Sequence, residues 1–352
     1  VYMCVTFAAL INVVDYSEPE ISKRAAAVTD KMLSMLALHT YKTGIVAPMG
    51  RVYRSVLYPF DQGAMALMNL INPKLPYTFG EGWLGFYASS HYPIPEGLVK
   101  LMEDDVETNY TTGNARVYLE KNDDYCLTSV ASPREPFTRW ENETLKEDVD
   151  ITTHNFTKSF NERFHGTTYF RPGTYGYQQH MWYAALDGEA SIFVTHPGST
   201  SEEGDMRPGY WHGNGVMPAL KQQHGLLGGI YVIPDEHPIG YTHLYCPECR
   251  FDEVIHEENW IFLRKETGYL ALWCSKKMEA HNGMNFNCEQ RAYSKNAAYL
   301  CVCGGKKSDA SFAAFIKRAK ETSPSYDKKS KTLTAQNFEL SYVACKDVTQ
   351  FL

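Results

Sequence analysis

The stretch Arg171–Asn214, RPGTYGYQQHMWYAALDGEASIFVTHPGSTSEEGDMRPGYWHGN, decides how the fold is interpreted. An apolar run at its centre, Ser191–Thr195, is bounded by Gly and Pro and predicts a buried strand. Two polar segments rich in aromatic residues, Tyr175–His180 and Tyr210–Asn214, flank this run. Because a rigid sheet can hold such side chains toward a ligand, the pattern indicates a binding or catalytic surface. The alternative is that these residues are buried and hydrogen-bonded within a sandwich.

Upstream of this stretch, the chain is predicted to be helical. Apolar residues recur at three- and four-residue spacing, and the patterns cover Tyr2–Val14, Ile21–His39, Asp61–Ile71 and Pro95–Glu103. We expect the second helix to have its N-cap near Ser17, with Pro19 in the first turn. Four helices form an incomplete bundle, so we expect missing helices upstream or a partner chain that covers them. The opening at Val1 inside a helical pattern is consistent with a fragment, and a targeting sequence would then lie upstream.

From Glu107 onward the pattern changes to the alternation typical of strands. The predicted strands are Ala115–Glu120, Tyr125–Val130, Thr167–Phe170, Ala190–Thr195, Gly228–Ile233, Thr242–Tyr245, Trp260–Arg264, Tyr269–Cys274, Ala298–Val302 and a last pair within Lys331–Ala344. One further helix is predicted over Ser308–Thr322. The sequence therefore predicts an α+β chain, with a helical part over residues 1–106 and a large antiparallel β-sandwich over residues 107–352.

Composition limits the partners and leaves the location open. A formal net charge of -7 argues against a binder of phosphate backbones, and we expect neither nucleic acid nor a membrane as partner. Nine cysteines, an odd number without the spacing of a disulfide scaffold, favour a reducing compartment. Glycosylation triplets beginning at Asn109, Asn142 and Asn155 favour secretion instead. Both a cytoplasmic and a secreted location are therefore kept.

Two segments carry a resemblance to a known family. GYQQHMWYAALDGEASIFVTHPGS (176–199) and RPGYWHGNG (207–215) resemble the heparinase II/III-like polysaccharide lyases, which join an (α/α) toroid to an antiparallel β-sandwich. The resemblance implies that residues 1–106 are the C-terminal part of such a toroid, and that the substrate is an acidic polysaccharide. Two departures are visible, because the toroid is short and Met181-Trp182 replaces the acidic residue that follows the family's histidine.

The segment 49–54, MGRVYR, carries side chains that lyase chemistry requires on the helical side. A lyase must neutralise the uronate carboxylate so that the adjacent C–H becomes acidic, and Arg51 and Arg54 can supply that charge. Tyr53 can transfer a proton, since guanidinium groups stabilise the phenolate. The alternative is that both arginines pair with surface carboxylates while Tyr53 packs within the fold.

The sandwich side supplies the remaining candidates. His180 and His212 are candidate bases, and Asn214 is a candidate donor to the substrate carboxylate. Indole and amide groups suit sugar subsites because aromatic faces pack on pyranose rings, and the candidates are Gln178, Gln179, Trp182, Tyr210 and Trp211. Each residue taken singly also has a structural interpretation.

A metal is the one cofactor considered, as a structural zinc or calcium ion. Cys246 and Cys249 form a Cys-x2-Cys pair, Cys301 and Cys303 form a Cys-x-Cys pair, and four such thiolates can hold zinc. The competing interpretation is that these cysteines are small apolar residues of a sheet core. Sandwich histidines, namely His180, His196 and His243, are alternative ligands.

The leading hypothesis is a polysaccharide lyase that cleaves a uronic-acid-containing glycan by β-elimination. Whether the chain is an enzyme stays open, because a non-catalytic carbohydrate-binding or scaffold protein on the same fold is the alternative. A glycoside hydrolase is the third hypothesis, for which the sequence identifies no carboxylate pair at a defined separation.

Overall fold

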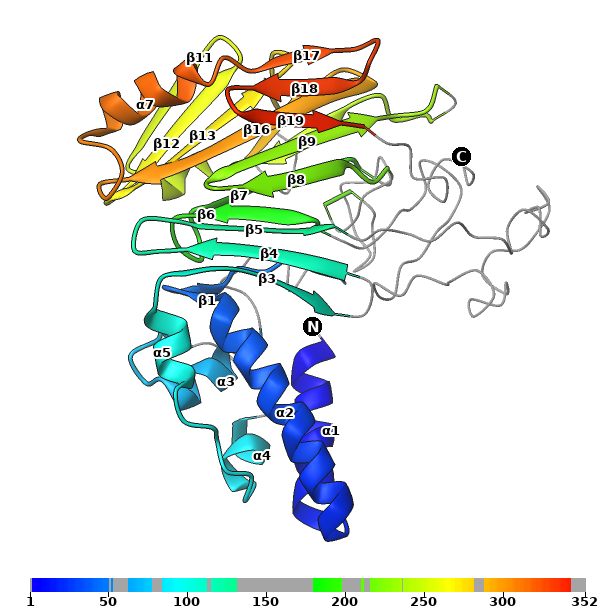
Figure 1. Cartoon of the computed structure of the whole chain (residues 1–352), viewed down its shortest axis with the longest axis vertical. Coiled ribbons are helices and arrows are strands. Elements are labelled where there is room, and N and C mark those ends of the chain that lie inside the picture. Colours follow the sequence, from blue (N-terminus) through cyan, green and yellow to red (C-terminus); the bar gives the residue numbers. More distant parts are fainter. Residues whose placement is uncertain are drawn as a thin grey trace, which may run out of the picture.

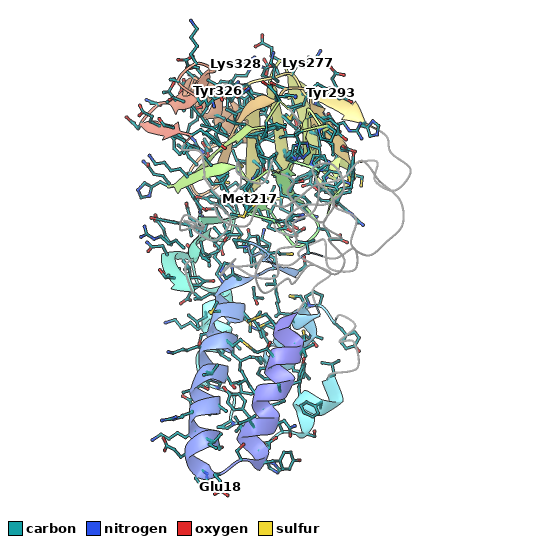
Figure 2. The ribbon with its side chains drawn as sticks, turned by 90° about the vertical axis from the view of Figure 1, so that its right-hand side faces the viewer. Glu18, Met217, Lys277, Tyr293, Tyr326 and Lys328 are labelled. Carbon is teal, nitrogen blue, oxygen red and sulfur yellow. The ribbon has the colours of Figure 1, made fainter. Side chains whose placement is uncertain are left out.

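The structure, a computed structural model, describes residues 2–50, 52, 63–77, 84–112, 115–131, 180–197, 210–211, 216–235, 237–281 and 288–342. These residues form a mixed α+β fold in which antiparallel sheets dominate, as the change of periodicity predicts. Figure 1 shows the helices at one end, two stacked sheets in the middle and a small sheet with one helix at the other end. Glu18, between the two long helices, and Lys328, in a turn of the small sheet, lie near opposite ends (Figure 2).

The helical part has a hairpin of two long helices and three short helices that pack beside it (Figure 1). They are α1 (Tyr2–Tyr16), α2 (Pro19–His39), α3 (Ala64–Ile71), α4 (Leu84–Ser89) and α5 (Leu98–Glu103). Their shared core is apolar, with Phe7, Ile11, Leu33 and Met65 almost fully buried. The N-cap of α2 is Glu18 and not the expected Ser17, and Pro19 begins the helix because its missing N–H needs no partner there. None of the described helices is both long and apolar enough to span a membrane.

The stretches 40–59 and 72–93, which connect the predicted helices and are predicted to be loops, contain short elements. The first holds a small hairpin, β1 (Thr40–Tyr41) and β2 (Gly44–Ile45), and the second holds α4. Both were missed because Gly, Pro and aromatic residues interrupt the pattern, and because elements of two to six residues are too short to show a period.

The first large sheet has eight strands in the order β14-β15-β10-β7-β6-β5-β4-β3, all antiparallel. They are β3 (Val106–Thr112), β4 (Ala115–Lys121), β5 (Cys126–Ala131), β6 (Trp182–Ala185), β7 (Ser191–Thr195), β10 (Thr242–Tyr245), β14 (Glu279–His281) and β15 (Glu289–Ala292). Strand β7 is the predicted apolar run, and all five of its residues are buried. Since β3 begins at Val106, the change from helix to strand coincides with the predicted boundary, although the independence of two domains stays a prediction.

The second large sheet has six strands in the order β11-β12-β13-β16-β9-β8. They are β8 (Ala219–Gln223), β9 (Leu226–Val232), β11 (Glu253–Glu257), β12 (Trp260–Lys265), β13 (Gly268–Cys274) and β16 (Asn296–Gly305). A continuous apolar core separates the two sheets, formed by Trp182 and Leu244 from one and Leu270 and Cys301 from the other. This face-to-face packing is that of a β-sandwich.

A helix and a small sheet cover the outer face of the six-stranded sheet. Helix α7 (Phe312–Glu321) and a three-stranded sheet, β17 (Ser325–Asp327), β18 (Thr332–Ala335) and β19 (Phe338–Ser341), pack on it. Ser311 caps α7, since its side chain accepts a hydrogen bond from the N–H of Ala314, so the helix begins later than the predicted Ser308. The outer face of the eight-stranded sheet is covered differently, because Tyr41, Val46 and Val52 of the helical part pack there.

Candidate functional site

The outer face of the eight-stranded sheet carries a buried cluster of aromatic and imidazole rings. Phe193 of β7 lies at its centre, with ring centroids 4.1 Å from His180, 5.1 Å from Tyr183 and 5.0 Å from Tyr245. The alternation of β7 directs Phe193 to this face, while Ile192 and Val194 point into the core between the sheets. The structure therefore places His180 and Trp211, from the two ends of the quoted stretch, on one surface.

His180 is fully buried, and both of its ring nitrogens have partners. Its Nε2–H donates to the carbonyl of Trp211 at 2.6 Å, so in the neutral ring Nδ1 accepts from the hydroxyl of Tyr183 at 2.5 Å. Neither nitrogen is left to remove a proton from a substrate. In this structure His180 holds the Trp211 backbone through its ring, and the base role stays a prediction that this geometry does not favour.

The indole rings are also engaged inside the protein. Trp182 is 1% exposed and points into the core between the sheets, because it lies one residue away from Tyr183 along β6. Trp211 stacks on His243, with ring centroids 4.0 Å apart and an interplanar angle of 8°. Both indole rings are thus buried in this structure, and their sugar-contact role stays a prediction.

A charged network lies beside Trp211. The hydroxyl of Tyr210 donates to Oε1 of Glu289 at 2.5 Å, and Arg291 donates from Nη2 to that hydroxyl at 2.5 Å. The same carboxylate accepts from Nε of Arg291 at 2.7 Å and lies 3.2 Å from Nδ1 of His243. Tyr210, predicted as a sugar contact, is thus a buried member of this network.

Burial and hydrogen bonding act in opposite directions on the carboxyl of Glu289. Burial raises its pKa, but hydrogen bonds from His243, Arg291 and Tyr210 outweigh burial and hold the pKa at about 2. The pKa of Tyr210 is raised by burial and by the adjacent Glu289 carboxylate. Burial lowers the pKa of His243, whose imidazole is fully enclosed. The network therefore holds one fixed negative charge beside one fixed guanidinium.

Several predicted site residues lie outside the described residues, namely Arg51, Tyr53, Arg54, Gln178, Gln179, His212 and Asn214. Their immediate neighbours are described. Met49 and His180 exchange two backbone hydrogen bonds, of 2.9 and 3.0 Å, and Val52 is fully buried in the ring cluster. Val52 contributes to the same apolar cluster as Tyr183 and Trp211.

The cysteines do not form the predicted metal site. Cys246, Cys301 and Cys303 line the core between the sheets, whereas Cys249 is exposed. Burial raises the pKa of the Cys246 thiol, which disfavours the thiolate that zinc requires. Within the described ranges, no group of three or more His, Cys, Asp or Glu side chains could hold a metal ion, and this includes His180, His196 and His243. The zinc and calcium hypotheses therefore have no support in this part of the chain.

Tyr183, Phe193, Glu289 and Arg291 were not predicted as site residues from the sequence. The sequence does contain a pattern that could have indicated them. Glu289 and Arg291 are two residues apart, as are His243 and Tyr245, and in a strand this spacing places both members of a pair on one face. Recognising them required knowing that β10 and β15 are neighbours. No protein-family model matches the chain, and no curated protein shows significant similarity to it. The function is therefore argued from the residues and their geometry.

Proposed function

We propose that the protein is a heparinase II/III-like polysaccharide lyase that cleaves a uronic-acid-containing glycan by β-elimination. One observation carries the proposal: Met49 and Val52 anchor their segment to the sandwich face that carries His180 and Trp211. That segment also contains two arginines and Tyr53, the groups that the reaction needs. In this proposal, residues 1–106 are part of an (α/α) toroid.

The proposed roles follow from the chemistry of elimination. Arg51 and Arg54 neutralise the uronate carboxylate, which acidifies the neighbouring C5–H. A base, His212 or the phenolate of Tyr53, removes that proton, a C4–C5 double bond forms, and the C4–O bond to the leaving sugar breaks. The phenol of Tyr53 then protonates the leaving oxygen, with its own proton when His212 is the base and with the proton taken from C5 when Tyr53 is the base. Asn214 donates a hydrogen bond to the carboxylate.

Buried groups hold the residues next to His212 in place. His180 fixes the carbonyl of Trp211, and Glu289 with Arg291 fixes the side chain of Tyr210. These contacts end one residue before His212 in the chain. Rigid support of this kind is what a reaction centre requires from residues that do not react.

The proposal is tested by incubating the protein with heparan sulfate, chondroitin, hyaluronan and alginate and following near-ultraviolet absorbance of the unsaturated product. We expect a rise with at least one polymer, and we expect Tyr53→Phe to lower the rate by about 10²-fold or more, because the proton carrier is lost. Tyr77→Phe is the matched control, since Tyr77 is exposed in the helical part. No absorbance rise with any polymer, or equal rates for both variants, would contradict the proposal.

A non-catalytic carbohydrate-binding protein is the second candidate. It is favoured by His180, which is buried with both ring nitrogens occupied, and by the buried ring of Trp211. In that case the wild type binds glycan without forming product, and Tyr53→Phe binds with unchanged affinity. Release of reducing ends without absorbance would identify a glycoside hydrolase instead.

A further inference from the structure

A row of side chains leads from the buried network to the surface along β10 and β15. Tyr245 is opposite Glu289 and His243 is opposite Arg291 in the register of these two strands. Tyr241 and Tyr293, two residues further along, continue the row with ring centroids 5.5 Å apart. The exposed fraction rises along the row, from 1% for the Glu289 side chain to 11% for Arg291 and 53% for Tyr293.

The outer end of this row is held rigidly. The guanidinium of Arg291 lies 4.6 Å from the ring centroid of Tyr241 and is bonded inward to Glu289 and Tyr210. Cation–π contact and two hydrogen bonds together restrict it to one position. The guanidinium, ion-paired with Glu289 and 11% exposed, therefore lies in a fixed position next to Tyr241, whose ring contacts the exposed ring of Tyr293.

Exposed aromatic rings are rare on this sandwich. Among the described residues from 106 onward, Tyr118 and Tyr293 are the two exposed large aromatic or aliphatic side chains, while the others lie between Val5 and Ile94. Tyr118 lies on β4, near the opposite edge of the same sheet, and no Arg or Lys ring contact accompanies it among the described residues. Tyr293 is thus distinguished by its neighbours and not by exposure.

We propose that Tyr293, Arg291 and Tyr241 form a surface subsite for an acidic pyranose ring of a glycan. The ring of Tyr293 packs on the apolar face of the sugar, at little entropic cost because tyrosine has few rotatable bonds. Arg291 attracts the carboxylate or sulfate of that sugar. The inference rests on the proposed function for its ligand class. It adds residues that bind the glycan at a distance from the bond that is cleaved.

Affinity electrophoresis of the full chain tests this subsite, with heparan sulfate, chondroitin, hyaluronan, alginate, neutral dextran or single-stranded DNA in the gel. We expect Tyr293→Ala to weaken binding to an acidic polysaccharide by roughly tenfold, the loss of one stacked ring. Tyr293→Phe keeps the ring and should bind like the wild type. Tyr118→Ala, which removes another exposed ring of the same sheet, should also bind like the wild type.

The outcomes separate this inference from the proposed function. Binding that Tyr293→Ala weakens, without any unsaturated product, would contradict the lyase and support the subsite. Formation of unsaturated product together with unchanged glycan binding in Tyr293→Ala would support the lyase and contradict the subsite. Equal loss in Tyr118→Ala, binding to dextran as strong as to acidic polymers, preference for DNA, or no binding to any polymer would each overturn the subsite.

Discussion

Glu289 shows at the residue scale how hydrogen bonds stabilise a buried carboxylate. It is 1% exposed, and three donors, from His243, Arg291 and Tyr210, surround it. Taking a charge out of water is unfavourable, yet here the donors lower the pKa of the carboxyl from 4.5 to about 2. The folded protein therefore stabilises the ionised form of the Glu289 carboxyl.

Glu289→Gln should lower the free energy of unfolding by about 3 kcal/mol at neutral pH. Because the folded-state pKa is depressed, this stability is present above the unfolded pKa of about 4.5 and is lost as pH falls through about 2. Urea unfolding of both proteins at pH 7 and near pH 2.5 measures the difference, which should shrink at the lower pH.

A surface carboxylate provides the control for that measurement. Glu253 pairs with Arg264 at 3.0 Å, but its side chain is 45% exposed. Glu253→Gln should change the free energy of unfolding by less than about 1 kcal/mol at either pH, because water screens exposed pairs. A loss as large as that of Glu289→Gln would mean that the buried network contributes nothing specific.

At the scale of elements, Lys121 of β4 caps the C-terminal ends of two helices. Its buried ammonium donates to the carbonyls of Leu101 and Met102 in α5, at 2.6 and 3.1 Å, and to that of Thr40 after α2, at 3.1 Å. Carbonyls in the last turn of a helix have no partner within the helix, and a cation is favourable there. Burial lowers the pKa of Lys121 to about 8, so the charge is retained at neutral pH.

Lys121→Met should destabilise the protein by about 3 kcal/mol, because three buried or partly buried carbonyls lose their donor while the apolar volume is kept. Hydrogen exchange should show the loss first at α5 and at the end of α2. Lys100→Met is the matched control, since Lys100 lies on α5 but is 78% exposed. Equal effects of the two substitutions would show that Lys121 does not secure these helix ends.

At the scale of the whole molecule, the two large sheets meet closely at one end of the sandwich. A Cβ added at Gly268 of β13 would lie 2.0 Å from the carbonyl oxygen of Asp124, which precedes β5 in the other sheet. Backbone atoms cannot move aside as flexible side chains can. Only glycine permits this approach of the two sheets. Glycine is therefore required at this position by the packing of the sandwich and not by the conformation of β13.

Gly268→Ala should lower the free energy of unfolding by about 3 kcal/mol, the upper range for overpacking, since the sheets must separate locally. Gly85→Ala is the control, because Gly85 lies in α4 and an added Cβ would meet nothing within 4 Å. That substitution should stabilise the protein by about 0.5–1 kcal/mol through helix propensity. Thermal unfolding of both variants measures the two effects, and a neutral Gly268→Ala would contradict the close contact.

The regular elements were the most predictable part. Thr242–Tyr245 and the strand around Ser191–Thr195 were predicted from local pattern, and the long helices differ from prediction by a few residues at their ends. Edge strands such as β11, with its charged residues, were missed because they alternate weakly. The predicted strand Thr167–Phe170 lies outside the described residues.

What the sequence by itself determined is the class of the fold, since the periodicity of apolar residues depends only on near neighbours along the chain. The tertiary structure decided which face each side chain of the stretch from Arg171 to Asn214 occupies. Trp182 points inward and Tyr183 outward because β6 packs between β5 and β7, and His180 is enclosed because Tyr183 and Trp211 bond to it. Burial and bonding arise from residues distant in the chain, so only the packed sheets could show that both ring nitrogens of His180 have partners inside the protein.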